Sequence, residues 1–422
     1  MSPYVRKFVA GETPVAPTIV RPRGKESPPA TPAPVPAPPS RPTRIESVDI
    51  LRGIVMVIMA LDHVRDFLMN PHFDPTDLTQ TTAAIFLTRW ITHYCAPVFV
   101  FLAGTGAFLS ASRGKSTGDL SRFLWTRGLM LVVFEFTIVR WGWLFNFGMS
   151  QLFVQVIWAI GVSMICLAAL IHLPKWAIAT FGIVMVAGHN LLDGIAPESF
   201  GSLGWLWGVL HVSRIFPLSG GVALFPLYPL IPWIGVMAAG YAFGAIMLYE
   251  PGRRVKTLFR LGVGLTVGFI VIRALNVYGD LVPWTAQKDG LFTFFSFLNT
   301  TKYPPSLDYL LMTLGPSILA LALLEKGAGK VGQFFIVYGR VPMFYYIVHL
   351  YLVHAVTVIA GAVQGYGFSP FFDLWLGFPQ AYGYGLPVVY VVWCVVVLAL
   401  YPACRWYGKL KQTRKSVWMS YI

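Results

Sequence analysis

Apolar runs long enough to cross a membrane recur along this chain from residue 48 to residue 407. A helix needs about 20 apolar residues to cross about 30 Å of hydrocarbon. Only 12% of the residues are charged, about half the fraction in a soluble domain. We therefore predict an all-α fold, a polytopic transmembrane helix bundle with ten spans. The predicted spans are 48–69, 85–111, 122–140, 150–171, 175–192, 228–248, 258–276, 307–324, 333–360 and 386–407. The interrupted apolar stretch 203–216 is either an eleventh span or a helix in the membrane interface.

The segment before the first apolar run is polar and rich in proline. Within it, residues 31–40 alternate Pro with small residues, a composition that favours extended polyproline conformations and buries too little surface to fold. We expect a disordered cytoplasmic tail at 1–46, a transmembrane domain at 47–408 and a basic cytoplasmic tail at 409–422. No signal peptide precedes the first span, so we expect that span to act as its own insertion signal.

Basic residues alternate from one connection to the next. Most of the 32 Lys and Arg residues lie in the N-terminal tail, in every second connection and near the C-terminus. The intervening connections hold only Arg214, Lys288 and Lys302. The positive-inside rule places the basic set in the cytoplasm, and we expect both termini there. The same charges suit insertion and anionic lipids, so we predict no nucleic-acid binding.

Sequence motifs for metal or nucleotide chemistry are missing. Cys95, Cys166, Cys394 and Cys404 lie singly inside apolar runs, as small packing residues do. The chain has neither a complete Gly-x-x-x-x-Gly-Lys-Ser/Thr phosphate loop nor a His-Glu-x-x-His zinc helix. We predict no bound metal.

The first span carries ionisable residues, each of which costs about 3 kcal/mol at mid-membrane and is a functional candidate by default. Asp49 and Arg52 are three residues apart near its cytoplasmic end and can pair. Asp62, His63 and Arg65 lie near its outer end. Arg52 and His63 share one helix face, and eleven residues at 1.5 Å each separate them by about 16 Å along the axis.

Other spans bring polar residues to the same outer depth once their directions are assigned from charge. Both Tyr345 and Tyr346 have the helical spacing needed to orient the ring of His349. Each of these residues also has a structural interpretation, as an interfacial anchor or a surface ion pair, and that alternative stays open. The residues are His93, Arg273, Lys302, Tyr345, Tyr346 and His349.

Six strings of the sequence belong together: Ser47–Gly53, Asp62–Asp66, Thr92–Gly104, Thr301–Ser306, Met312–Pro316 and Tyr338–His349. In this order they resemble the heparan-α-glucosaminide N-acetyltransferase catalytic-domain family. The similarity runs from about residue 44 to 355 and is closer to a bacterial branch than to the lysosomal enzyme. The last string is also similar to integral-membrane acyltransferases of surface polysaccharides.

The resemblance implies an enzyme of the bacterial inner membrane that moves an acetyl group from cytoplasmic acetyl-CoA to a sugar or amino sugar on the outer side. Lysosomal members depend on a histidine in the connection after the first span, a position represented here by His72 or by the preceding His63. We favour His63, the better buried, as general base or transient acyl carrier, and His349 as a second proton-transfer or orienting group. Arg52 and Arg340 would bind the phosphates of CoA. The predicted acceptor-binding residues are Asp49, Arg52, Asp62, Arg65, His93, Arg273, Lys302, Tyr345 and Tyr346.

Two other functions remain open from the sequence. A proton-coupled transporter of a small molecule or glycan precursor would use the same ionisable residues as a relay. A membrane scaffold would recruit partners through the Pro-rich tail. The expected partners are the lipid bilayer, acyl-CoA and a glycan or amino-sugar acceptor. The sequence leaves open whether the chain forms a homodimer.

Overall fold

The computed structural model describes residue 16 and residues 45–70, 72–372 and 377–414. The chain divides into two units, 1–43 and 44–422, and the description below concerns the second. The predicted disordered tail lies almost wholly outside the described residues, and so does the end of the predicted basic tail.

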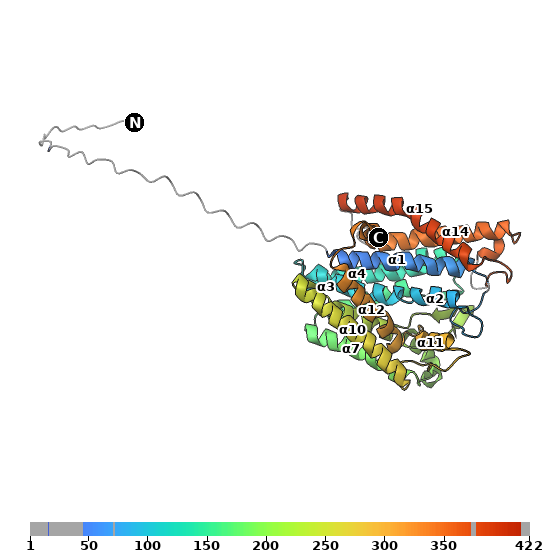
Figure 1. Ribbon diagram of the computed structural model, residues 1–422, viewed down its shortest axis with the longest axis horizontal. Coiled ribbons are helices and arrows are strands. Elements are labelled where there is room, and N and C mark those ends of the chain that lie inside the picture. Colours follow the sequence, from blue (N-terminus) through green and yellow to red (C-terminus); the bar gives the residue numbers. More distant parts are fainter. Residues whose placement is uncertain (1–15, 17–44, 71, 373–376, 415–422) are drawn as a thin grey trace, which may run out of the picture. The chain divides into compact units, whose positions relative to one another are not determined.

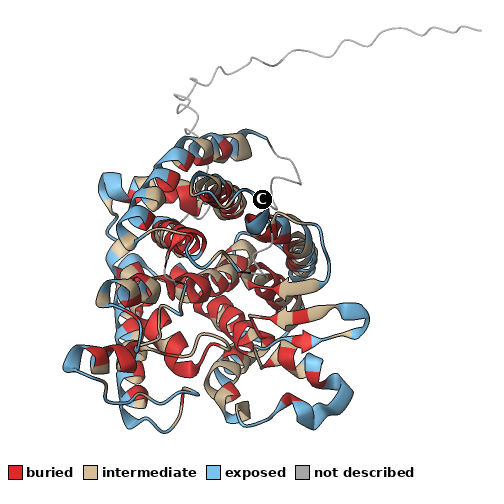
Figure 2. Ribbon diagram, turned by 90° about the vertical axis from the view of Figure 1, so that its right-hand side faces the viewer, coloured by how far each residue is buried: buried red, intermediate tan, exposed pale blue. Residues whose placement is uncertain are grey.

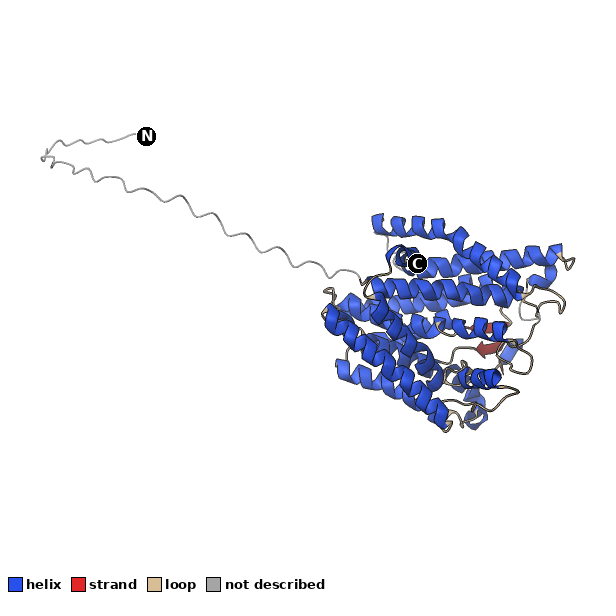
Figure 3. Cartoon of the chain, viewed as in Figure 1, coloured by secondary structure: helices blue, strands red, loops and turns tan. Residues whose placement is uncertain are grey.

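The second unit consists mainly of α-helices, most of which run roughly side by side (Figures 1 and 3). The helices are α1 Glu46–Leu68, α2 Ala83–Thr92, α3 Cys95–Ala111, α4 Thr117–Phe134, α5 Arg140–Leu144, α6 Val156–Leu170, α7 Lys175–Gly188, α8 Gly204–Leu210, α9 Leu230–Phe243, α10 Pro251–Leu275, α11 Gly290–Leu298, α12 Leu307–Leu324, α13 Gly329–Gly339, α14 Pro342–Val363 and α15 Leu386–Thr413. A π-helical turn, Glu135–Val139, joins α4 to α5, and short 3-10 turns join several other elements.

Three short strands, which the sequence did not predict, lie at one end of the helices (Figure 3). They are β1 Gln151–Val154, β2 Phe216–Pro217 and β3 Ala223–Pro226. The central strand β3 pairs in parallel with β1 and antiparallel with β2. The small sheet therefore ties the loop before α6 to the loop before α9.

Within the part of the chain that the structure describes, seven helical segments are long and apolar enough to cross a membrane. This finding supports an apolar helix bundle, but the predicted count of ten or eleven spans is not confirmed. The charged residues of α1 and α4 exclude them by composition, and α6 has only 15 residues. Because α8 covers seven residues, about 10 Å of helix, the stretch 203–216 forms no eleventh span. The seven segments are Ala83–Ala111, Lys175–Leu192, Leu230–Leu248, Pro251–Leu275, Leu307–Leu324, Pro342–Val363 and Leu386–Thr413.

Glycines allow the central helices to pack backbone against backbone. A Cβ added to Gly53 of α1 would lie 1.9 Å from the carbonyl oxygen of Phe335 in α13, and one added to Gly339 would lie 2.0 Å from that of Asp49. Small residues at helix contacts are the usual solution where lipid removes the hydrophobic drive for helix association. The buried residues accordingly gather on the inner helix faces, and the exposed ones lie along the outer faces (Figure 2).

Ion pairs join helix termini at one end of the bundle. Glu325, just after α12, bonds to Ser47 of α1 and to Arg254 of α10. Asp49 of α1 lies 3.9 Å from the guanidinium of Arg340, just before α14. The beginnings of α1 and α10 therefore meet the end of α12, and the beginning of α14 lies beside that of α1. These are the relative directions that the alternation of basic connections predicts.

The predicted span 85–111 is interrupted where α2 ends and α3 begins. Pro97 has no backbone N–H to donate to the carbonyl of His93, four residues earlier. The hydroxyl of Tyr309 in α12 donates to that carbonyl instead, at 2.7 Å. The interruption is thus compensated by a tertiary hydrogen bond, which fixes α12 against the junction of α2 and α3.

Candidate active site

Two cavities lie end to end along α1. The larger, which we call the histidine chamber, has a volume of about 620 Å³ and is lined by Asp62 and His63. The smaller, which we call the basic channel, has a volume of about 360 Å³ and is lined by Arg52 and Met56. Four residues, one each from α1, α3, α6 and α14, line both cavities, and we call them the shared ring. They are Met59, Phe99, Val156 and Tyr346.

His63 is the residue of the chamber best suited to acid–base chemistry. Its Nδ1 lies 2.7 Å from Nε2 of His349, a residue of α14 that is fully buried. The two rings are stacked, with centroids 4.9 Å apart, and the rings of Trp143 and Tyr346 meet His63 edge-on. The packing therefore holds the His63 ring in one orientation.

A network of charges, largely buried except at Asp66, lies beside His63. The carboxylate of Asp62 accepts two hydrogen bonds from Arg89, at 2.7 and 2.8 Å, and one from the Thr92 hydroxyl. Arg65 lies 2.8 Å from the same carboxylate and 2.5 Å from that of Asp66. Because each carboxylate has a guanidinium partner, the network stays charged within the protein at tolerable cost, and it fixes the outer part of α1 against α2.

Lys302 and Tyr303 form part of the chamber wall opposite α1, together with Tyr228. The ammonium of Lys302 lies 5.1 Å from the centre of the Tyr303 ring. Burial would raise the pKa of the Tyr303 phenol, but the neighbouring Lys302 ammonium and the Arg89 guanidinium outweigh it and hold that pKa below its usual value. A more acidic phenol is a better hydrogen-bond donor to negative oxygen.

Arg273 holds in place the loop that carries Lys302. Its guanidinium donates to the backbone carbonyls of Phe297, Val282, Ser296 and Asn299, at 2.9 to 3.1 Å. The side chain is 1% exposed and does not line either cavity. Arg273 therefore packs behind the chamber wall against backbone carbonyls, and its predicted contact with substrate stays a prediction.

The basic channel combines a few basic side chains with a largely apolar lining. Arg52, Arg127, Arg340 and Lys411 are the basic residues of its lining, and most of the remaining lining is apolar. Arg52 also donates to Asp49 at 3.3 Å and to the Gly339 carbonyl at 3.2 Å. Such a channel suits a ligand with an anionic head and a thin, weakly polar arm.

Six of the residues predicted from the sequence line the cavities. His63, Asp62, Lys302 and Tyr346 line the chamber, whereas Arg52, Arg340 and again Tyr346 line the channel. Seven others lie outside both cavities, and several of them support residues that line them. These are Asp49, Arg65, His72, His93, Arg273, Tyr345 and His349.

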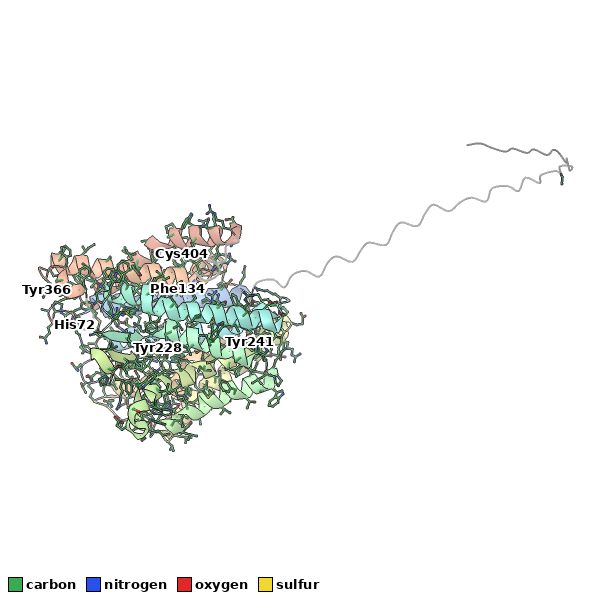
Figure 4. All side chains as sticks on the ribbon, turned by 180° about the vertical axis from the view of Figure 1, so that it is seen from behind. His72, Phe134, Tyr228, Tyr241, Tyr366 and Cys404 are labelled. Carbon is green, nitrogen blue, oxygen red and sulfur yellow. The ribbon has the colours of Figure 1, made fainter. Side chains whose placement is uncertain are left out.

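His72 and His93 are two of the residues outside the cavities. His72 is exposed, and its Nε2 lies 3.0 Å from the carbonyl oxygen of Tyr382. It lies toward the same end of the bundle as Tyr366 (Figure 4). His93 is buried, with its ring against Tyr309.

Several lining residues were not among the predicted site residues. Asp66 directly follows Arg65 and Arg89 lies four residues before His93, and the charge of each within or beside an apolar run was the available signal. Tyr228, Tyr303 and Trp143 carry no such signal, because aromatic residues near helix ends are ordinary in membrane proteins. Among the described residues, no group of three or more His, Cys, Asp or Glu side chains is arranged to hold a metal ion.

The fold and the site define a class of protein: a helical membrane protein with a buried histidine site that a basic channel approaches from the other end of the bundle. The catalytic-domain model of heparan-α-glucosaminide N-acetyltransferase matches residues 44–279. The match covers more than half of the chain, which therefore belongs to that family and is acetyltransferase-like. The matched part includes α1 to α10, and the resemblances at 301–306, 312–316 and 338–349 lie beyond it. No curated protein matches the chain.

Proposed function

We propose that this protein is an integral-membrane acyltransferase that transfers an acetyl group from acetyl-CoA to a sugar or amino-sugar acceptor. The observation that carries the proposal is the pair of cavities that meet at the shared ring. One cavity has four basic residues in its lining, and the other contains His63. The family, named for N-acetyl transfer to a glucosaminide, supports the same reaction.

The dimensions of the channel suit the donor. Arg52 and His63 are eleven residues apart on α1, which is about 16 Å of helix, comparable to the length of an extended phosphopantetheine arm. With the CoA phosphates bound at Arg52, Arg127, Arg340 and Lys411, the arm would follow the apolar channel and bring the thioester through the shared ring. Arginine and lysine are the usual partners of phosphate.

The chamber supplies the groups that acyl transfer requires. Nε2 of His63 would take the proton of the acceptor amine or hydroxyl as its nitrogen or oxygen bonds to the thioester carbon. Tyr303 and Lys302 would donate to the oxyanion that forms on the carbonyl oxygen. The C–S bond then breaks, and the departing CoA thiolate takes the proton from the His63 imidazolium. The atoms balance without a metal or a redox partner.

The basic connections support an orientation with the channel mouth in the cytoplasm, where acyl-CoA is made. Both termini would then be cytoplasmic, and the acceptor would enter the chamber from the opposite side. In a bacterial inner membrane that side is the periplasm, where surface glycans are modified.

The direct test uses purified full-length protein in nanodiscs, [¹⁴C]acetyl-CoA and a panel of amino sugars. We expect labelled N-acetylated product from the wild type, a loss of at least a hundredfold in His63→Ala, and near wild-type transfer by His72→Ala. Calorimetry with CoA should give binding of similar affinity in all three proteins. A wild type that does not bind CoA would overturn the enzyme assignment, and transfer that survives His63→Ala would overturn the choice of base.

A transporter would also need a path through the bundle, so the two cavities favour it as the second candidate. The two functions differ in their product. In proteoliposomes, an acyltransferase converts an enclosed amino sugar to its acetylated form when acetyl-CoA is added outside. A transporter moves the sugar across unchanged and needs no CoA.

A further inference from the structure

Two hydrogen bonds in series connect His63 to the backbone of α14. Nδ1 of His349 lies 2.7 Å from the carbonyl oxygen of Tyr345, and Nε2 of His349 lies 2.7 Å from Nδ1 of His63. Nε2 of His63 makes no hydrogen bond with a described residue, and it is not sealed from solvent. Since His63 lines the chamber, this nitrogen is its free end.

The series fixes where each proton lies. A backbone carbonyl only accepts, so Nδ1 of His349 must carry a proton. In a neutral imidazole the other nitrogen is then an acceptor, so Nε2 of His349 must receive a proton from Nδ1 of His63. That leaves Nε2 of neutral His63 without a proton and with its lone pair available in the chamber.

We propose that His349 is a positioning residue that holds His63 in the Nδ1–H tautomer and so makes Nε2 the base. The part of this proposal that concerns catalysis rests on the function proposed above. The neighbouring groups fit the assignment, because His349 is fully buried and Tyr345 stacks on it with ring centroids 5.0 Å apart. Rotating the His63 ring by 180° would replace Nδ1 with a carbon at His349 and break the series.

In this arrangement the proton of the reaction passes only through Nε2 of His63, and His349 transfers none. When Nε2 of His63 takes the acceptor proton, Nδ1–H of the imidazolium continues to donate to the neutral His349. The proton then leaves from Nε2 to the CoA thiolate. His349 therefore acts through His63 and never contacts the substrate, which narrows the two roles that the sequence left open for it.

A matched pair of variants separates positioning from packing. In His349→Gln, the side-chain oxygen stands near the place of Nε2 and can accept from Nδ1–H of His63. In His349→Met, a side chain of the same length offers only a weak acceptor. The buried N–H of His63 then lacks a good partner, a penalty that favours the other tautomer.

Kinetics of the full-length protein give the first readout. We expect kcat to fall about tenfold to hundredfold in His349→Met and by less than about threefold in His349→Gln, with KM for acetyl-CoA unchanged in both. Equal losses in the two variants, or an effect on KM alone, would contradict the positioning role.

The second readout needs neither a variant of His349 nor activity. In ¹⁵N-histidine-labelled wild type at pH 8, where most imidazoles are neutral, the ¹⁵N spectrum distinguishes protonated from unprotonated ring nitrogens. The His63 signal is assigned by its absence in His63→Gln. We expect a protonated Nδ1 and an unprotonated Nε2, and the reverse pattern would overturn the proposal. If the tautomer is as expected but the wild type transfers no acetyl group, the positioning of His63 by His349 stands and the proposed acyltransferase function fails.

Discussion

Replacing Gly53 with alanine should move α1, the helix that carries Arg52, Met59 and His63. The added Cβ would lie 1.9 Å from the Phe335 carbonyl oxygen, whereas real Cβ atoms keep about 3.0 Å from such atoms. The contact involves backbone on both sides, so α1 and α13 must separate by about 1 Å. Overpacking of this kind costs about 1–3 kcal/mol of unfolding free energy, and a displacement of about 1 Å at a site costs about a hundredfold in rate.

The assay compares thermal unfolding in detergent with acetyl transfer. The control is Gly264→Ala in α10, where an added Cβ has no atom within 4 Å and should leave both measurements nearly unchanged. We expect Gly53→Ala to lower the melting temperature by several degrees and to reduce kcat more than its stability loss explains. If Gly53→Ala has the same melting temperature and the same kcat as Gly264→Ala, the close packing of α1 against α13 is refuted.

Three further predictions concern the cavities and their charges. Asp62→Asn and Arg89→Met should each lower the unfolding free energy by about 3 kcal/mol, because each leaves a largely buried charge without its partner. In thermal unfolding, the double variant should lose at least about 1 kcal/mol less than the sum of the two single losses. Arg340→Gln should raise KM for acetyl-CoA about threefold to tenfold and leave kcat unchanged, with a smaller effect on acetyl-dephospho-CoA if Arg340 binds the 3′-phosphate. Met59→Ala should raise kcat/KM for isobutyryl-CoA relative to acetyl-CoA by about tenfold, because it widens the shared ring; an unchanged ratio would exclude Met59 as a steric limit.

The arrangement of helix ends could be predicted because it depends on local signals. Apolar length identifies most of the helices, and the alternation of basic connections gives their relative directions. Those directions bring Glu325 to Ser47 and Arg254 at one end, and bring His349 to His63 in the interior. The face shared by Arg52, Met59 and His63 follows from helical period alone, and all three residues line cavities.

The walls of the chamber could not be predicted because they come from loops held by distant contacts. Phe153 and Phe225 reach the chamber through the pairing of β1 with β3, and such short strands leave no recognisable period in the sequence. Arg273 fixes the segment just before Lys302 and Tyr303 through its contacts with the carbonyls of Ser296, Phe297 and Asn299. The sequence identified Arg273 as a costly intramembrane charge, but whether a guanidinium binds substrate or backbone depends on what surrounds it.

The cost of charges in α1 explains how the site is distributed along it. Arg52 lines the channel, Met59 lies in the shared ring, and His63 lines the chamber, so a single helix contributes to every part of the proposed path. From Asp49 onward, its ionisable groups either line a cavity or have partners in the protein: Asp49 is near Arg52 and Arg340, and Asp62 has Arg65 and Arg89. A helix so charged is held in place less by lipid than by its protein neighbours. The contact of Gly53 with α13 therefore stabilises the helix on which the donor path, the ring and the base all depend.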